Sequence, residues 1–184
     1  MEITAVQAGF DLDHIAIQSS NQKIMSEFYN KIMNMDLVLR DNQDIICKGD
    51  SRKLILKKGK KNKLSFAGFS CRSLESLIAF KSSIIKKGVK IIDFINPYLK
   101  KGSFSIKDPD ENVISFGLSL RDNNNYKKSF KGPLQHLTFS SLNVEKFQKF
   151  YSEKLGFKIT DTVIHHDRSL ATCFVTSNHE HHTL

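Results

Sequence analysis

The sequence predicts an α+β protein built from tandem βαβββ modules. Three observations support this fold class. A strand–helix–strand pattern occurs twice, short alternating segments follow each predicted helix, and Gly, Pro, Asn and Asp mark the turns between them. We expect two modules paired in an N-terminal domain and a third, unpaired module at the C-terminus.

The pattern of residues 134–160 recurs, without a gap, within residues 12–40. His14 aligns with His136, an offset of 136 − 14 = 122 residues. A repeat of this kind indicates a duplicated supersecondary unit. The aromatic pairs of the two helices also align, and we expect them to pack in the core against the sheet: Phe28-Tyr29 and Phe150-Tyr151.

Each module is predicted from hydrophobic periodicity and capping residues. Asn21 and Ser73 are the expected helix N-caps, and Gly156 is expected to end the third helix in a left-handed conformation. Residues 1–10 carry no strong signal. The expected strands are 12–19, 36–40, 44–48 and 53–57, then 64–71, 89–95, 102–107 and 113–118, then 134–139, 157–163 and 170–176.

The domain division follows from one polar stretch. Residues 121–131 (RDNNNYKKSFK) lack periodicity and are predicted to be a linker. Residues 1–120 would then form the domain of two modules, and residues 132–184 the first half of a C-terminal domain.

Charge, hydrophobicity and cysteine content indicate which partners and which cellular compartment to expect. The formal net charge is +9, but the lysines are spread along the chain, and the densest run, at residues 57–63, is interpreted as a solvated turn, with a phosphate-binding patch as the alternative. No nucleic-acid partner is therefore expected. No apolar run approaches 18 residues and no secretory signal is present, so we expect no membrane association. Three widely spaced cysteines favour reduced thiols in a cytoplasmic protein.

Two motifs carry a family resemblance. Residues 108–116 (DPDENVISF) resemble the DPDGN-x-x-E-F ending of a module, and residues 135–157 resemble its H-x-x-F…FY…LGF opening. The chain thus resembles the vicinal oxygen chelate superfamily, which includes glyoxalase I, bleomycin-resistance proteins and type I extradiol dioxygenases.

The third module is most similar to the extradiol ring-cleaving dioxygenases, through residues 155–161, 171–175 (ATCFV) and 181–184 (HHTL). That resemblance implies a metal-free N-terminal pair of modules and a C-terminal pair that holds Fe(II) or Mn(II). His136 would be the first metal ligand, and His182 the catalytic acid and base. The second histidine ligand and the glutamate ligand belong to a fourth module, and the 184 residues end before both. In the N-terminal pair, His14 occupies the ligand position, but Ser115 stands where a glutamate would be needed.

The resemblance implies an Fe(II)-dependent extradiol dioxygenase, or an incomplete form of one, that inserts O₂ into a catechol-type aromatic diol. The alternative is a non-catalytic small-ligand-binding or remnant protein of the same fold. Glyoxalase or lyase chemistry would also need ligands that this chain lacks. An unpaired third module would expose a sheet edge, so we expect a homo-oligomer formed through this module, or a poorly ordered third module.

The histidines also have structural interpretations. His136 could be a half-buried strand histidine with a hydrogen-bonded ring. His182 could be a solvated member of a terminal cluster with His179 and His181. His165 and His166 are expected on the surface of a hairpin turn.

Overall fold

The computed structural model describes residues 2–40, 43–60, 63–120 and 132–184. The chain separates into two compact units. The first contains residues 2–12, Phe69–Leu120 and Gln135–Leu184, and the second contains Asp13–Gly68 with residues 132–134. The linker predicted at 121–131 lies outside the described residues, so the division into domains stays a prediction.

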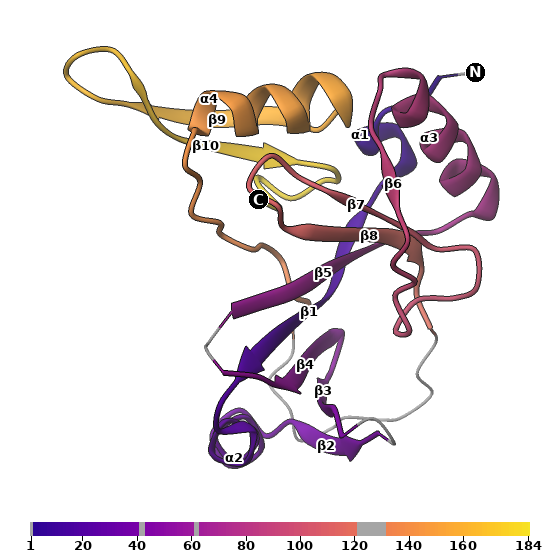
Figure 1. Ribbon diagram of the computed structural model, residues 1–184, viewed down its shortest axis with the longest axis vertical. Coiled ribbons are helices and arrows are strands. Elements are labelled where there is room, and N and C mark those ends of the chain that lie inside the picture. The colour runs from indigo at the N-terminus through magenta and orange to yellow at the C-terminus, as the bar shows by residue number, and fades with distance from the viewer. Residues whose placement is uncertain (1, 41–42, 61–62, 121–131) are drawn as a thin grey trace. The chain divides into compact units, whose positions relative to one another are not determined.

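The second compact unit holds the first βαβββ module (Figure 1). Its strands are ordered β2-β3-β4-β1, and β1 runs parallel to β4 while the other neighbours are antiparallel. This arrangement confirms the predicted fold class and the order of elements in the module. The elements are β1 (Asp11–Ser19), α2 (Gln22–Lys31), β2 (Asp36–Leu39), β3 (Ile45–Gly49) and β4 (Arg52–Lys58).

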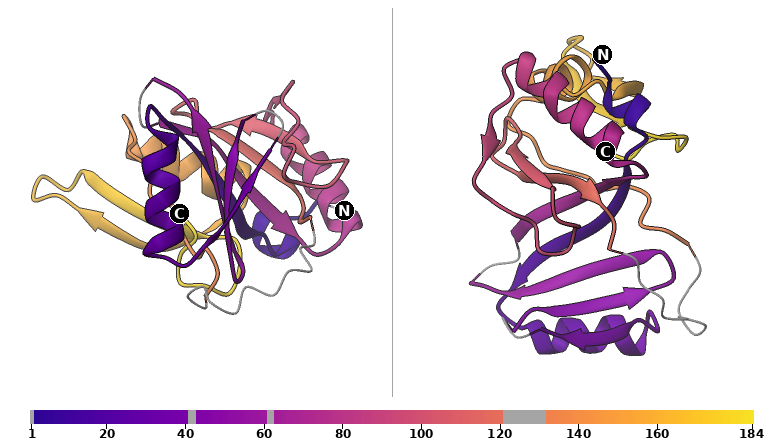
Figure 2. Two further views of the ribbon diagram at one scale, coloured as in Figure 1. Left: turned by 90° about the horizontal axis from the view of Figure 1, so that it is seen from below. Right: turned by 90° about the vertical axis from the view of Figure 1, so that its right-hand side faces the viewer.

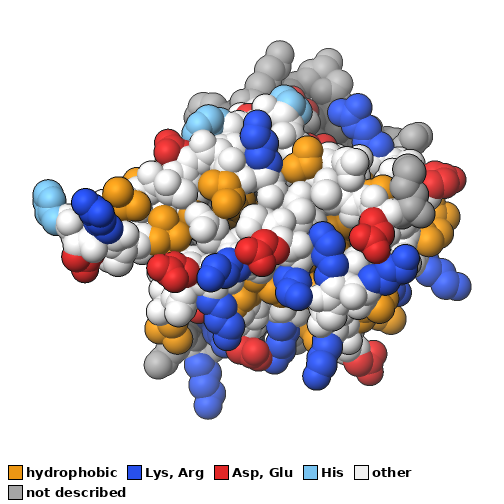
Figure 3. Space-filling model, turned by 90° about the horizontal axis from the view of Figure 1, so that it is seen from above, with side chains coloured by type: hydrophobic (Ala, Val, Ile, Leu, Met, Phe, Trp, Pro, Cys, Tyr) orange, Lys and Arg blue, Asp and Glu red, His pale blue; other side chains and the backbone are white. Residues whose placement is uncertain are grey.

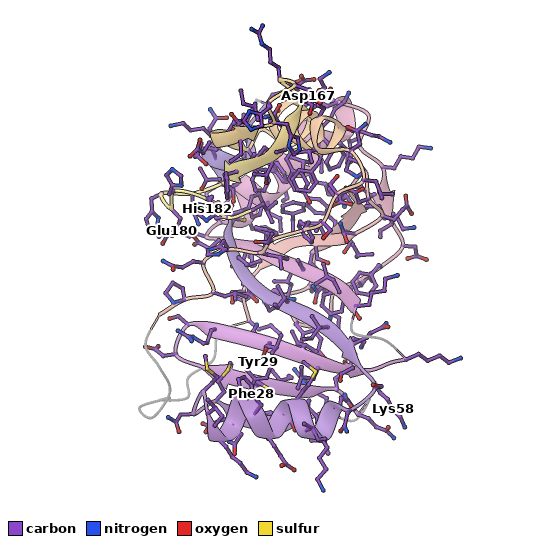
Figure 4. All side chains as sticks on the ribbon, turned by 90° about the vertical axis from the view of Figure 1, so that its left-hand side faces the viewer. Phe28, Tyr29, Lys58, Asp167, Glu180 and His182 are labelled. Atoms are coloured by element: carbon purple, nitrogen blue, oxygen red, sulfur yellow. The ribbon has the colours of Figure 1, made fainter. Side chains whose placement is uncertain are left out.

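Helix α2 lies along one face of these strands (Figure 2). Asn21 caps it, because its side chain accepts a hydrogen bond from the Ile24 N–H group. Tyr29 packs on the buried cluster of Met35, Cys47, Leu54 and Leu56. The predicted burial of Phe28 is wrong, since 52% of this side chain is exposed. Neighbouring helical positions point about 100° apart, so only one member of the Phe28-Tyr29 pair can face the sheet (Figure 4).

The second module contributes helix and strands to the first compact unit. An aromatic cluster forms the core there: Phe10 contacts Phe80 and Phe116 with ring centroids 4.8 and 4.9 Å apart. The elements are β5 (Lys63–Cys71), which begins in the other unit, α3 (Leu74–Lys86), β6 (Ile91–Ile92), β7 (Phe104–Lys107) and β8 (Val113–Leu118). Ser73 caps α3 as predicted, accepting from the Ser76 N–H group.

Two local predictions in this unit are wrong. The strand expected at residues 89–95 is reduced to β6, because the chain turns where the buried Asn96 side chain accepts from the Tyr98 N–H group. Residues 1–10, where no element is expected, contain helix α1 (Ala5–Ala8). Thr4 and Gln7 form a capping box at its start, which is a local signal that the sequence does carry.

The third module consists of α4 (Val144–Lys149), the π-helical turn η1 (Phe150–Lys154), β9 (Lys158–Ile164) and β10 (Leu170–Thr176). Figure 1 shows α4 beside the β9–β10 hairpin. Gly156 has a φ of 72°, which confirms the predicted left-handed end of the helix. The aromatic pair of this helix differs from that of α2, because Tyr151 is fully buried and Phe150 is partly buried.

A buried hydrogen bond joins the second and third modules within the first compact unit. The Tyr151 hydroxyl donates to Asp108 Oδ2 over 3.2 Å. Asp108 also accepts from the Asp110 and Asn112 N–H groups and from the Asn112 side chain. Burial raises the pKa of the Asp108 carboxyl group, and these hydrogen bonds oppose that rise.

His14, the repeat partner of His136, is enclosed in the second compact unit. Its side chain is fully buried, and its Nδ1 atom pairs with Asp13 Oδ1, which also accepts from Lys53 Nζ at 2.9 Å. Its ring lies over Gly68 of the neighbouring strand β5, where an added Cβ atom would overlap the imidazole. The protein itself therefore occupies the space around this ring.

We expect Tyr151→Phe to lower the free energy of unfolding by about 1–2 kcal/mol at pH 7, since it removes one donor from a buried carboxylate. The pKa of Asp108 should rise further in this variant. A carboxyl pKa raised in the folded state means that the folded protein binds the proton more tightly than the unfolded chain. Stability then declines as pH rises from the ordinary value of 3.8 through the raised pKa, and this decline should be larger in the variant.

Urea denaturation between pH 4 and pH 7 measures both effects. Tyr29→Phe is the matched control, because the Tyr29 ring packs on the cluster of Met35, Cys47, Leu54 and Leu56 and not against Asp108. Equal losses in the two variants would contradict the role of the Tyr151–Asp108 bond.

Gly68→Ala should destabilise the chain by about 1–3 kcal/mol, because the buried His14 ring cannot move away from the added methyl group. In a His14→Ala background the same substitution should cost much less. A double-mutant cycle by chemical denaturation measures this coupling. Additive effects would show that the His14 ring does not limit position 68.

Candidate metal and proton-transfer site

The loop after β10 carries the histidine cluster of the third module. At its end the chain returns to β10: the Thr183 and Leu184 N–H groups donate to the Val175 carbonyl, and the Val175 N–H group donates to the Leu184 carbonyl. Thr183 and Leu184 are buried. His182 is held immediately before this anchor and is partly buried, while His179 and His181 are exposed. His182 is therefore less exposed than His179 and His181, and both interpretations of it stay predictions.

His136 lies on the segment that was predicted to open the third module as a strand. Residues 134–139 do not form a strand. Their described backbone pairs only at separate points, including the Leu137 N–H group, which donates to the Thr183 carbonyl over 3.1 Å. A strand needs a continuous ladder of such bonds, so hydrophobic alternation is not sufficient here. The single bond nevertheless holds His136 beside the end of the histidine loop, and its side chain is exposed.

The structure brings the two predicted site residues together. The ring centroids of His136 and His182 are 4.8 Å apart, and their planes are inclined by 53°. The ring of Phe174, on β10, lies 5.1 Å from that of His182 and gives the site a hydrophobic side. Figure 4 shows His182 and Glu180 on the same loop. Sequence reasoning did not identify Phe174 as a site residue, although it lies in the ATCFV segment that carries part of the family resemblance.

His181 makes a direct hydrogen bond to His182. Their Nδ1 atoms are 3.0 Å apart, so one ring donates and the other accepts. The pKa of His182 is lowered from its ordinary value, first by burial and then by the charges that His136 and His181 would carry. A lowered pKa favours the neutral form of His182. A neutral imidazole at an accessible edge can accept a proton and return it, which is the chemistry expected of an acid and base.

The described residues do not provide a complete set of metal ligands. Within the parts of the chain that the structure describes, no group of three or more His, Cys, Asp or Glu side chains is arranged to hold a metal ion. A 2-His-1-carboxylate site needs three converging ligands. In the second module, Ser115 is buried and shares a 2.8 Å hydrogen bond with Ser105. His136 can therefore offer one imidazole ligand, but these residues do not complete an iron site.

The surface away from the histidine loop carries charged side chains of both signs (Figure 3). On the face seen in Figure 3, acidic side chains lie between the Lys and Arg side chains. His165 and His166 are exposed, as expected. None of the described helices is long and apolar enough to span a bilayer.

Comparison with known structures shows the same fold in ring-cleaving enzymes. The halotolerant catechol dioxygenase BphC matches 95% of this chain with a TM-score of 0.81 and 19% identity, and 63% of that enzyme is covered. A catechol 2,3-dioxygenase matches all of the chain with a TM-score of 0.78 and 17% identity, and 66% of it is covered. Homoprotocatechuate 2,3-dioxygenase from Arthrobacter globiformis gives a TM-score of 0.76 at 14% identity over 94% of this chain and 57% of that one.

At these identities the likeness shows a shared fold. The chain spans less than two thirds of the length of these enzymes. A search by sequence among curated proteins found no match. A family profile, in contrast, matches residues 11–116, which is more than half of the 184-residue chain. The chain belongs to the Glyoxalase/Bleomycin resistance protein/Dioxygenase superfamily.

Proposed function

We propose that the chain forms part of an extradiol-type dioxygenase that cleaves an aromatic diol with O₂. His136 would be one ligand of an Fe(II) or Mn(II) ion, and His182 would transfer the proton. The observation that carries this proposal is the 4.8 Å approach of the two rings, in a chain whose fold is shared with catechol dioxygenases. A bound metal ion would bring the diol and O₂ together.

The proposal assigns roles to three side chains, namely His182, Phe174 and His136. The lowered pKa of His182 favours its neutral form, and its ring is hydrogen-bonded to His181, so His182 could take a proton from a diol hydroxyl and later release it. Phe174 offers an aromatic ring beside His182 on which a planar substrate could rest. Of the described residues only His136 is assigned as a metal ligand. The other ligands would therefore have to come from residues that the structure does not describe or from outside this chain.

The proposal includes a cytoplasmic location. Three reduced cysteines, all buried and free, suit a cytoplasmic enzyme.

The β9–β10 hairpin has an exposed apolar side. Strand β10 pairs with β9, and β9 exposes Ile159, Val163 and Ile164. An exposed edge with apolar side chains favours assembly with another copy, so a homo-oligomer is part of the proposal.

A second function is favoured by one specific observation, namely the incomplete ligand set of the described residues. A protein of this fold without a metal could bind a small aromatic ligand without reaction. The two functions differ in whether ligand affinity depends on a metal.

Anaerobic titration with Fe(II) tests the metal proposal. We expect His136→Ala to weaken Fe(II) binding by at least about tenfold, because changes to outer-shell partners alone cost about 10–100-fold in metal affinity and His136 would be a direct ligand. His165→Ala, at the exposed hairpin turn, should bind Fe(II) as the unchanged chain does. Equal affinity in the His136 variant and the unchanged chain would remove His136 from a metal site.

Calorimetric titration with catechol distinguishes the two functions. For a dioxygenase site, catechol should bind measurably with Fe(II) present under nitrogen and at least about tenfold more weakly after treatment with EDTA. For a binding protein, the two affinities should be equal. His182→Ala tests whether the ligand reaches the same place under either condition.

A further inference from the structure

The histidine loop depends on side-chain hydrogen bonds for its shape. Residues 177–182 follow β10 and contain neither helix nor strand. The loop is anchored at its far end by Thr183 and Leu184, which bond to Val175. Its near end must be fixed in another way if His182 is to hold one orientation toward His136.

Asn178 supplies that near anchor. Its Oδ1 atom accepts from the Glu180 N–H group over 2.9 Å and lies 3.2 Å from the Thr176 hydroxyl. Its Nδ2 atom donates to Asp11 Oδ1 over 2.8 Å. One amide thus closes the turn that leads into His181 and His182, and at the same time ties this turn to the start of β1.

Asp11 is a firm point of attachment. It follows Phe10, whose ring is fully buried against Phe80 and Phe116. The Phe10 carbonyl accepts a 2.7 Å hydrogen bond from the hydroxyl of Ser177, which is also fully buried. Two successive residues of the loop, Ser177 and Asn178, are therefore bonded to two successive residues of the N-terminal segment, 167 positions away in each case.

We propose that Asn178, oriented by Asp11, is a positioning residue that sets the His182 ring against His136. The chemical importance of this orientation rests on the function proposed above. The structural part of the inference concerns only the loop, and it can be tested without metal, substrate or activity.

The hydrogen bond between Asn178 and Asp11 has a direction, and substitutions can exchange its donor and its acceptor. The Asp11 carboxylate can only accept, and the Asn178 amide donates to it. Asn178→Asp would place two carboxylates 2.8 Å apart and should drive the turn away from β1. The exchange Asp11→Asn with Asn178→Asp restores the hydrogen bond in the opposite direction. The carboxylate introduced at position 178 can still accept from the Glu180 N–H group.

NMR spectroscopy of the full chain provides the readouts. In the unchanged chain we expect a nuclear Overhauser effect between the His136 and His182 ring protons, because the ring centroids are 4.8 Å apart. In Asn178→Asp this signal should be lost, and exchange of the Glu180 amide proton should be about fivefold faster. In the exchanged double variant both readouts should return to their original values. Asp11→Asn alone should change little, since an amide oxygen also accepts.

Asn143→Asp is the matched control for charge. Asn143 caps α4 by accepting from the Lys146 N–H group, and aspartate caps helices equally well. This variant should keep both NMR signals. Circular dichroism confirms folding of each variant, and if Asn178→Asp does not fold, Asp11→Ala tests the same hydrogen bond by removing the acceptor alone.

The outcomes separate the two proposals. An unchanged ring–ring signal in Asn178→Asp or Asp11→Ala, or a loss that the exchange does not restore, would overturn the positioning role. Loss with restoration supports it. If the unchanged chain shows this positioning but His136→Ala leaves its affinity for Fe(II) unchanged, the proposed function fails and the positioning role remains.

Discussion

Burial of Phe10 is the constraint on which the first compact unit depends. Its ring packs between Phe80 of α3 and Phe116 of β8, so the N-terminal segment is fixed to the second module. Its carbonyl group accepts the buried Ser177 hydroxyl, so the same residue also fixes the end of β10. A hydroxyl in this environment is costly to leave without a partner, which makes the contact specific as well as tight. The histidine loop begins at this serine. A hydrophobic core contact therefore determines where the candidate site can form.

The two repeat-related histidines illustrate how one ancestral position can have two environments. His14 is enclosed by Asp13, Phe66 and the backbone at Gly68, with its ring edge-on to Phe66 at 5.9 Å. His136 is exposed and faces His182. A buried imidazole bonded to a carboxylate is held by the protein, whereas an exposed one beside a second imidazole can meet a ligand. The two residues are equivalent in the sequence repeat, but His14 lies in strand β1 and His136 lies in a segment without strand pairing, so their neighbours differ.

Helix burial differs between the modules in a related way. In α2, Ile24 and Phe28 remain more than half exposed although they recur at helical spacing. In the third module, Tyr151 is fully buried because Asp108 offers its hydroxyl a partner and Phe157 packs edge-on to its ring. Helical periodicity shows which residues share a face of the helix. It does not show whether another element covers that face.

The sequence by itself determined the fold class and most of the order of elements, because periodicity, N-caps such as Asn21 and Ser73, and the left-handed Gly156 are encoded within a few neighbouring residues. Motif resemblance indicated the family and led to His136 and His182. Only the tertiary structure decided that residues 134–139 lack strand pairing, that Phe28 is exposed, and that Asn178 meets the start of β1. The physical reason is range: caps and turns are made by local hydrogen bonds, whereas ladders, burial and the orientation of a loop depend on partners far away in the sequence.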